Sequence, residues 1–254
     1  MELVFITIIG IAVGSFSNVL IDRLSTGESI NGRSHCDYCK KTLRPLQLIP
    51  VLSFIAQRGR CAFCKKKLSY QYPLIEILLG ILFAIVWLYS VVYALPIRIV
   101  FLGIVTCLFV IFFADLKYQI IPDEVQVAFI IFSLLYVWFG SYSLNQVGYR
   151  LIAGIAVMSP ILFLHLITKG KGMGFGDVKF AFGMGVLLGI SGGLTALYIA
   201  FVTGAVYGII ALVTRTKSMK TKIAFGPFLI VGTALTLFMG LQLEALLTIF
   251  SFNR

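Results

Sequence analysis

Long apolar runs alternate with short polar connections along this chain, and one polar stretch, residues 22–71, is much longer than the others. A helix needs about 20 predominantly apolar residues to cross the hydrocarbon core of a bilayer. Eight runs predict such helices, at residues 3–21, 74–95, 97–114, 125–140, 151–168, 180–190, 194–213 and 225–250. The sixth run is short by itself, so its helix is expected to include residues 176–179 as well. The pattern therefore predicts an all-α, polytopic membrane protein with about eight transmembrane helices.

The composition leads to the same fold class. Of the 254 residues, 59% are hydrophobic and 12% are charged, whereas about a quarter of a typical globular chain is charged. Eight helices and the polar stretch 22–71 together use most of the chain, which excludes a large extramembrane domain. The first run is too long for a cleaved signal peptide and is followed by Asp22 and Arg23 instead of a small-residue cleavage site, so it is expected to be retained.

The charges predict the orientation of these helices. Eighteen of the 21 Lys and Arg residues fall in the loops after the first, third, fifth and seventh runs, and the other side has Arg98, Arg150 and Arg254. Because loops rich in Lys and Arg stay on the cytoplasmic side, we expect the long loop inside the cell and both termini outside. The net charge of +11 is then explained by topology and by contacts with anionic membrane lipid, and no nucleic-acid partner is expected.

Two CxxC pairs lie in the long loop. Cys36 and Cys39 are separated by 21 residues from Cys61 and Cys64, a spacing typical of a tetrahedral thiolate zinc site. Neighbouring lysines and arginines favour the thiolate form that binds metal. We therefore predict a structural Zn²⁺ ion held by these four cysteines.

Other interpretations of the cysteines remain open. Two disulfides are disfavoured, because the predicted topology puts the loop in a reducing compartment. A redox CxxC is less consistent with two such pairs in one short loop. His35 precedes Cys36 and is expected to be an exposed loop histidine, with metal ligation as the alternative. Cys107 lies within the third run and is expected to be a small buried apolar residue.

Ionisable residues near the apolar runs are few, and each is costly enough there to be considered for function. Glu244 falls in the last run and is expected to reach an interface. Glu76 opens the second run, where the helix dipole favours a carboxylate, so structure alone explains it. Asp115 ends the third run, and Asp177 follows Gly172-Met173-Gly174-Phe175-Gly176 before the sixth.

Asp115 and Asp177 are both expected at the cytoplasmic ends of their helices, where they can meet. Two carboxyl groups that share a desolvated site cannot both ionise easily, so one retains a proton while the other acts as a base on water. The glycines before Asp177 let the backbone approach a substrate closely. The alternative is that both aspartates are interfacial residues that cap helices.

The chain resembles the type IV prepilin peptidases, the bifunctional leader peptidase/N-methyltransferases of type IV pilus, type II secretion and competence systems. The resemblance covers nearly the whole chain. It rests on an ordered set of motifs: Gly14-Ser15-Phe16-Ser17-Asn18-Val19, Arg33-Ser34-His35-Cys36, Pro50-Val51-Leu52-Ser53, Gly59-Arg60-Cys61, Tyr72-Pro73-Leu74-Ile75-Glu76, Ile121-Pro122-Asp123, Gly174-Phe175-Gly176-Asp177-Val178-Lys179 and Phe225-Gly226-Pro227-Phe228. Ala224 and Ser25 stand where many members have proline.

The resemblance implies a GxGD aspartic endopeptidase of the bacterial cytoplasmic membrane. Asp115 and Asp177 match the two catalytic aspartates, and the four cysteines match the zinc-binding loop. Such an enzyme cleaves prepilins or pseudopilins after a glycine at the cytoplasmic face and then methylates the new N-terminus with S-adenosylmethionine. The chain is accordingly expected to comprise a first transmembrane helix (1–24), a zinc-binding loop linked to methyl transfer (25–71) and a seven-helix peptidase domain (72–254).

The remaining assignments are less specific. Gly59, Arg60 and Glu76 are expected to contact substrate or cofactor, with a structural role in folding the loop as the alternative. Lys179 holds negative charge at the site or only reaches lipid headgroups. A peptidase without methyltransferase activity and a zinc-stabilised, non-enzymatic transporter or scaffold are the competing functions. A catalytic zinc ion is disfavoured, because four cysteines leave no open position for water.

Overall fold

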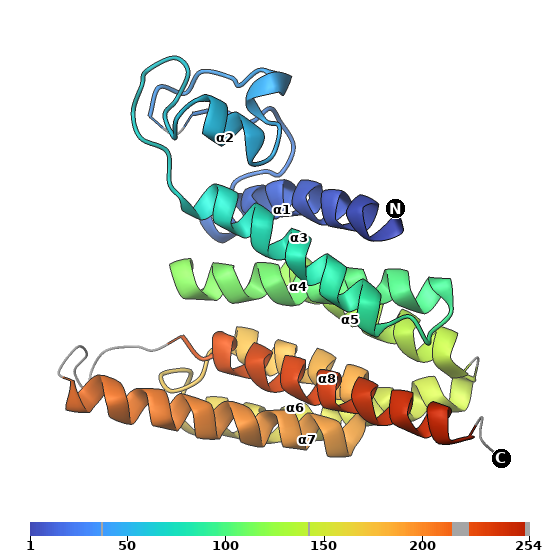
Figure 1. The fold of residues 1–254 in the computed structure, drawn as a ribbon. Helices are drawn as coiled ribbons and strands as arrows, with labels where there is room; N and C mark the ends of the chain where they lie inside the picture. Colours follow the sequence, from blue (N-terminus) through green and yellow to red (C-terminus); the bar gives the residue numbers. More distant parts are fainter. Residues whose placement is uncertain (37, 142, 215–223, 252–254) are drawn as a thin grey trace. The chain divides into compact units, whose positions relative to one another are not determined.

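The computed structural model describes residues 1–36, 38–141, 143–214 and 224–251, with side chains in the last helix described as far as Gly240. Apart from two isolated bridges, this part of the chain is helical and irregular, without strands (Figure 1). Its elements are α1 (Glu2–Thr26), η1 (Pro45–Gln47), α2 (Leu52–Ala56), α3 (Gln71–Tyr89), α4 (Leu95–Tyr118), α5 (Asp123–Ser141), α6 (Leu144–Ile167), α7 (Phe175–Val213) and α8 (Gly226–Ser251). The side chain of Glu244 and the basic loop 215–222 lie outside the described residues.

Among the described residues, six helices are long and apolar enough to cross a membrane, namely α1, α3, α4, α5, α6 and α7, and the described part of α8 is shorter. The predicted all-α, multi-pass membrane fold is therefore confirmed. The chain forms two compact units, Met1–Tyr89 and Ser90–Arg254, which are described separately below. The functional division into 1–24, 25–71 and 72–254 stays a prediction.

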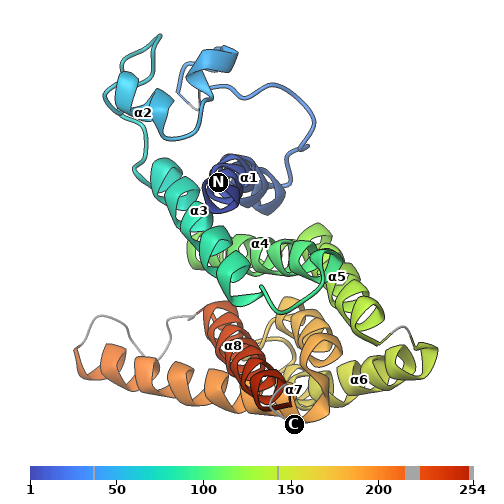
Figure 2. The same cartoon turned by 45° about the vertical axis from the view of Figure 1, so that its right-hand side comes forward.

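In the first unit, α1 packs along α3 (Figure 2). Small residues permit the close approach, since a Cβ atom on Gly14 would lie 2.7 Å from the Cα atom of Glu76. Ile21, Ile75 and Leu79 are completely buried in this interface. The Asn18 side-chain amide donates a hydrogen bond to the carbonyl oxygen of Tyr72 at 3.2 Å, which ties the end of the polar loop to α1.

In the second unit, α7 packs against α5, α6 and α8, while α4 packs against α5 and α8. Large side chains fill the space between these helices. Phe129 of α5 and Phe180 of α7 are both almost completely buried, and their rings stack with centroids 5.2 Å apart. The packing brings the end of α4, the start of α5, the end of α6 and the start of α7 to one end of the unit.

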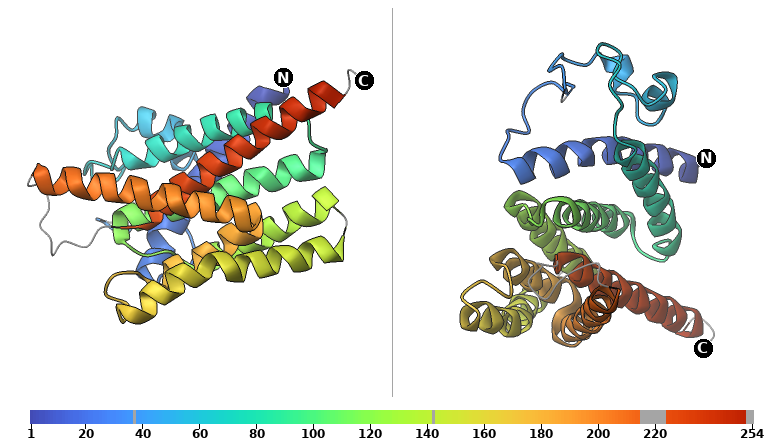
Figure 3. Two further views of the ribbon diagram at one scale, coloured as in Figure 1. Left: turned by 90° about the horizontal axis from the view of Figure 1, so that it is seen from below. Right: turned by 90° about the vertical axis from the view of Figure 1, so that its left-hand side faces the viewer.

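The helix α7 is interrupted at Gly189, which has φ 75° and ψ −177°. A Cβ atom on Gly193 would lie 3.4 Å from the Cα atom of Gly185, whereas eight residues of straight helix span about 12 Å. The chain therefore folds back at Gly189, and α7 is a helical hairpin whose halves can be followed in Figure 3. Its halves correspond to the predicted sixth and seventh transmembrane helices, and the first half does begin before residue 180, at Phe175.

Arg150 stabilises this turn. Its guanidinium donates a hydrogen bond to the carbonyl oxygen of Leu187 at 2.9 Å, an acceptor that the interrupted helix leaves free. A Cβ atom on Gly189 would lie 3.1 Å from an Arg150 nitrogen. The left-handed backbone and the nearby guanidinium both favour glycine at this position.

Replacing Gly189 by alanine is expected to lower the thermal unfolding midpoint of the detergent-solubilised protein, with a cost of roughly 1–3 kcal/mol. The matched control is Gly208→Ala, because a Cβ atom there meets nothing within 4 Å and alanine is the better helix former. Gly208→Ala should leave the midpoint unchanged or raise it slightly. Equal midpoints for the two variants would contradict the assignment of Gly189 as the hairpin turn.

Candidate active site and metal centre

Asp115 lies in the last turn of α4 and is only 5% exposed. Its Oδ2 atom accepts a hydrogen bond from the backbone N–H of Gly226, the first residue of α8, at 2.9 Å. A Cβ atom on Gly226 would lie 2.6 Å from that same oxygen. Glycine is therefore the residue that lets the N-terminus of α8 approach the carboxylate, and the dipole of α8 favours negative charge there.

Asp177 is the third residue of α7 and is 8% exposed. Its Oδ2 atom accepts a hydrogen bond from the backbone N–H of Gly174 at 3.0 Å. The loop before it is fixed from α6, where Nδ1 of His165 donates to the carbonyl oxygen of Met173 at 2.8 Å. The glycine-rich motif thus presents an N–H group, with no side chain between, to the carboxylate that follows it.

Asp115 and Asp177 lie at the same end of the second unit, since a Cβ atom on Gly176, next to Asp177, would lie 3.3 Å from Ile121, six residues after Asp115. In each carboxyl group the hydrogen bond to backbone engages Oδ2, and within the described part of the chain the other oxygen has no such partner. Two buried carboxyl groups at one end of a fold are the groups that an acid–base pair acting on water requires, and that Asp115 and Asp177 form such a pair stays a prediction. Helix capping alone explains the Gly174 contact, but not the burial of Asp115 at the same end of the unit.

Lys179 lies one turn into α7 and forms an ion pair elsewhere. Its ammonium group is 2.8 Å from both carboxylate oxygens of Asp123, at the start of α5, and 5.2 Å from the ring centroid of Phe175. Both members of the pair are more than one-third exposed. Lys179 is therefore committed to Asp123, a residue of the Ile-Pro-Asp motif that had no predicted role.

The four loop cysteines form one cluster. One ligand atom from each of Cys36, Cys39, Cys61 and Cys64 lies within 4.8 Å of all the others. Four thiolates around Zn²⁺ at about 2.3 Å would be about 3.8 Å apart, so the donor set fits a tetrahedral metal. All four cysteines are unlinked, which argues against the disulfide alternative. His35 is not part of the cluster found among the described residues.

The two CxxC segments have the same backbone geometry. In each segment, the backbone N–H of the residue after the second cysteine donates to the carbonyl oxygen of the first cysteine. These bonds join Lys40 to Cys36 at 2.8 Å and Lys65 to Cys61 at 3.0 Å. Both lysines have positive φ, 55° and 59°. N–H groups of Cys64 and Phe63 lower the pKa of the Cys61 thiol to about 7, whereas burial raises the pKa of Cys36 to about 11.

The structure gives Gly59 and Arg60 roles within this loop. Gly59 has φ 65°, its N–H donates to the carbonyl oxygen of Phe54 at 2.9 Å, and a Cβ atom would lie 3.1 Å from the Phe54 ring. Arg60 forms an isolated bridge with Lys67 across the second cysteine turn, as His35 does with Thr42 across the first. These contacts agree with the alternative of a structural role, and contact with substrate or cofactor stays a prediction.

Glu76 binds the polar loop to the helix pair of the first unit. It is 7% exposed, and its Oε2 atom accepts a hydrogen bond from the backbone N–H of Val51 at 2.7 Å. Val51 has φ 61° and ψ −53°, and Leu52 donates to the carbonyl oxygen of Pro50 at 2.6 Å, which together make a classic γ-turn. This turn is rare and strained. A buried carboxylate on α3 therefore stabilises a strained turn in the middle of the loop.

Comparison with known proteins identifies the family of this chain. Residues 8–90 match the Bacterial Peptidase A24 N-terminal domain, and residues 101–209 match the type IV leader peptidase family. A prepilin leader peptidase/N-methyltransferase of Burkholderia pseudomallei (strain 1026b) is 31% identical over 97% of this chain and 88% of its own length. The chain belongs to the type IV leader peptidase family. The predicted family is thus confirmed.

Two further relatives carry the same name. The protein of Bacillus subtilis (strain 168) is 29% identical over 92% of both chains, and that of Neisseria gonorrhoeae is 30% identical over 89% of this chain and 86% of its own. No solved structure matches the chain.

Three contributors to these sites escape sequence reasoning. Gly226 belongs to a quoted motif, but its partner Asp115 is 111 positions away. Asp123 likewise belongs to a motif without an evident partner. Gln126 of α5 is 2% exposed and lies in an apolar run that gave no signal for it. In each case the missing information is a contact between helices.

Purified protein is expected to contain about one zinc ion per chain by atomic emission, because four sulfur ligands satisfy one tetrahedral ion. Cys61→Ser should lose most of that metal. The matched control is Cys107→Ser, since Cys107 lies in α4 and outside the cluster, and it should keep the wild-type content. Full metal content in the Cys61→Ser protein would exclude a four-cysteine site.

Proposed function

We propose that this chain is a bifunctional membrane enzyme that removes the leader of prepilins or pseudopilins with the carboxyl pair Asp115 and Asp177, and then methylates the new N-terminus. The placement of two buried aspartates at one end of the second unit carries the first activity. Membership of the leader peptidase family and the names of its relatives support both.

The peptidase reaction needs only the carboxyl pair and a water molecule. One carboxyl takes a proton from the water while the other keeps its proton, so the water oxygen bonds to the scissile carbonyl carbon. The amide nitrogen then accepts a proton as the C–N bond breaks, which leaves the leader as a carboxylic acid and the mature protein as an amine. Because such a pair titrates as a unit, neither aspartate is assigned as the acid or the base. The N–H groups of Gly226 and Gly174 orient the two carboxyl groups.

The position of the pair near helix ends supports proteolysis over transport. Asp115 lies four residues before Gln119, the left-handed residue that ends α4. Asp177 is the third residue of α7. Transporter sites usually lie near the midplane of the bilayer. A substrate whose cleavage site immediately precedes a membrane helix presents that site at the surface. The excess of Lys and Arg in alternate loops supports the cytoplasmic surface.

The methyltransferase activity is proposed for the first unit. In the relatives' names it accompanies peptidase activity. The methyl donor is S-adenosylmethionine, whose sulfonium methyl group passes to the new amine. A metal-stabilised loop that Glu76 attaches to α1 and α3 supports such a site, because the contact keeps the loop in one position. Within this unit, Gly59, Arg60 and Glu76 act by shaping the loop.

Asp115→Asn and Asp177→Asn are each expected to reduce leader cleavage by at least about a thousandfold, since each keeps the shape of the side chain and removes the ionisable group. Cleavage is measured as the loss of leader mass from a co-expressed prepilin. The matched control is Glu124→Gln, an exposed carboxylate at the start of α5, which should process at the wild-type rate. Wild-type processing by either aspartate variant would refute the carboxyl pair.

Glu76→Ala is expected to reduce transfer of labelled methyl from S-adenosylmethionine to cleaved pilin by about tenfold to a hundredfold, because it removes a hydrogen bond to a charged acceptor. Glu76→Gln keeps an acceptor for Val51 and should stay within a few-fold of wild type. Leader cleavage and zinc content serve as controls for folding. If wild type cleaves but transfers no label, the chain is a peptidase only; if both variants transfer normally, Glu76 does not position the loop.

A further inference from the structure

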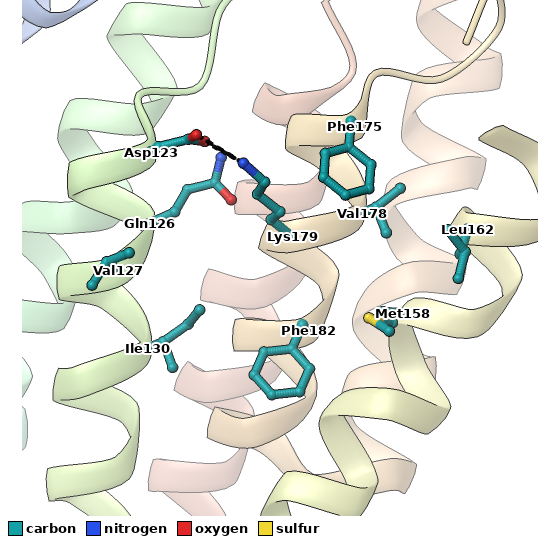
Figure 4. A pocket seen from close by; sticks show the side chains of 10 residues that line it. All are labelled: Asp123, Gln126, Val127, Ile130, Met158, Leu162, Phe175, Val178, Lys179 and Phe182. Atoms are coloured by element: carbon teal, nitrogen blue, oxygen red, sulfur yellow. Dashed lines mark hydrogen bonds and ion pairs between the residues drawn. The ribbon is translucent and has the colours of Figure 1, made fainter. Parts of the chain in front are cut away.

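A groove of about 460 Å³ lies between α5, α6 and α7 (Figure 4). Its polar residues, Asp123, Gln126 and Lys179, lie at one end, while Ile130, Met158 and Phe182 lie toward the other. All of these residues belong to the second unit. The groove is therefore polar at the end of the helices where the aspartates lie, and apolar along its length.

The polar end of the groove is close to the peptidase site. Phe175, Val178 and Lys179 line it, and they are immediate neighbours of Asp177 in the first turns of α7. Asp177 does not itself line the groove; its carboxyl group accepts the hydrogen bond from Gly174. The groove therefore begins beside the first turn of α7, the turn that also carries Asp177.

Gln126 presents an acceptor that no described residue satisfies. Its Nε2 atom donates to the carbonyl oxygen of Ile121 at 3.3 Å, which leaves Oε1 buried and without a hydrogen bond. An unsatisfied buried polar atom costs roughly 1–3 kcal/mol. Since the residue is 2% exposed and lines the groove, an N–H or O–H donor in the groove is what would satisfy it.

Resting on the proposed function, we propose that the groove binds the first turns of the substrate's own transmembrane helix, the segment that follows the cleaved bond. The first four N–H groups of a helix have no partner within the helix, and in hydrocarbon they must find acceptors. Gln126 Oε1 is an unsatisfied acceptor at the polar end of the groove, and Asp123 beside it is 66% exposed, which leaves its carboxylate open to a second donor besides Lys179. The apolar side chains beyond them match the apolar surface of such a helix.

A lipid acyl chain is the competing occupant. It would cover Ile130, Met158 and Phe182 equally well, but it carries no donor for Gln126. The unsatisfied acceptor therefore favours a polypeptide. The groove would then distinguish a substrate that includes its membrane helix from a peptide that ends just after the cleavage site.

The test compares two tryptophan variants of the full chain in detergent. Ile130→Trp fills the groove, whereas Ile131→Trp changes the next residue of the same helix, which is 51% exposed and does not line the groove. Each enzyme is assayed with a full-length prepilin and with a soluble peptide that contains the leader and cleavage site but stops before the apolar helix. The quantity measured is the ratio of kcat/KM for the two substrates.

Wild type and Ile131→Trp should both prefer the full-length prepilin. Ile130→Trp should lower the ratio by at least about tenfold, mainly through a higher KM for the full-length substrate. An unchanged ratio in Ile130→Trp would overturn the proposal and leave the groove to lipid. Wild type that cleaves neither substrate would instead count against the proposed function.

A second measurement does not depend on cleavage or on a bulky substitution. A photo-crosslinking amino acid replaces Met158, which lines the groove, or Ile155, which is 56% exposed and does not, in the Asp177→Asn background. Co-expressed prepilin should crosslink from position 158 through its apolar helix and not from position 155. Crosslinking only to lipid from position 158, or equal crosslinking of prepilin from both positions, would also overturn the proposal.

Discussion

Buried carboxylates in this protein depend on backbone N–H groups that approach them without a side chain between. Asp115 and Asp177 each accept one such bond, from Gly226 and Gly174. The first of these bonds fixes where α8 begins relative to α4, because a Cβ atom at Gly226 would collide with the carboxylate. The second shapes the loop that opens α7. The peptidase site therefore follows from two glycines as much as from two aspartates.

The same principle operates at two other irregular places in the described backbone. Val51 turns through a strained conformation, and Glu76 of α3 accepts its N–H. The hairpin in α7 leaves the carbonyl of Leu187 free, and Arg150 of α6 donates to it. Irregular backbone at membrane depth is tolerated only where its polar groups are satisfied. In the groove between α5, α6 and α7, by contrast, the side-chain oxygen Oε1 of Gln126 is buried without a hydrogen bond. This unsatisfied acceptor is why the groove is proposed to bind a polypeptide.

Much of the fold was predictable because its signals are local. Apolar runs identify the helices, including the two halves of α7, and the spacing of Cys36, Cys39, Cys61 and Cys64 brings four sulfurs together. The contacts of Arg150 and Gln126 were not predictable in this way. These helices are apolar around most of their circumference, so the sequence does not indicate which face of a helix meets its neighbour. Arg150 consequently counted only as a topological charge.

The division of the chain into two units bears on how one enzyme performs two reactions. The first family match, residues 8–90, ends one residue past the boundary between Tyr89 and Ser90, and the second match, residues 101–209, lies wholly within the second unit. Cleavage converts an internal amide into a terminal amine, so the product of the second unit is the substrate proposed for the first. A product that keeps its transmembrane helix stays in the same membrane as both units, and tethering raises its effective concentration.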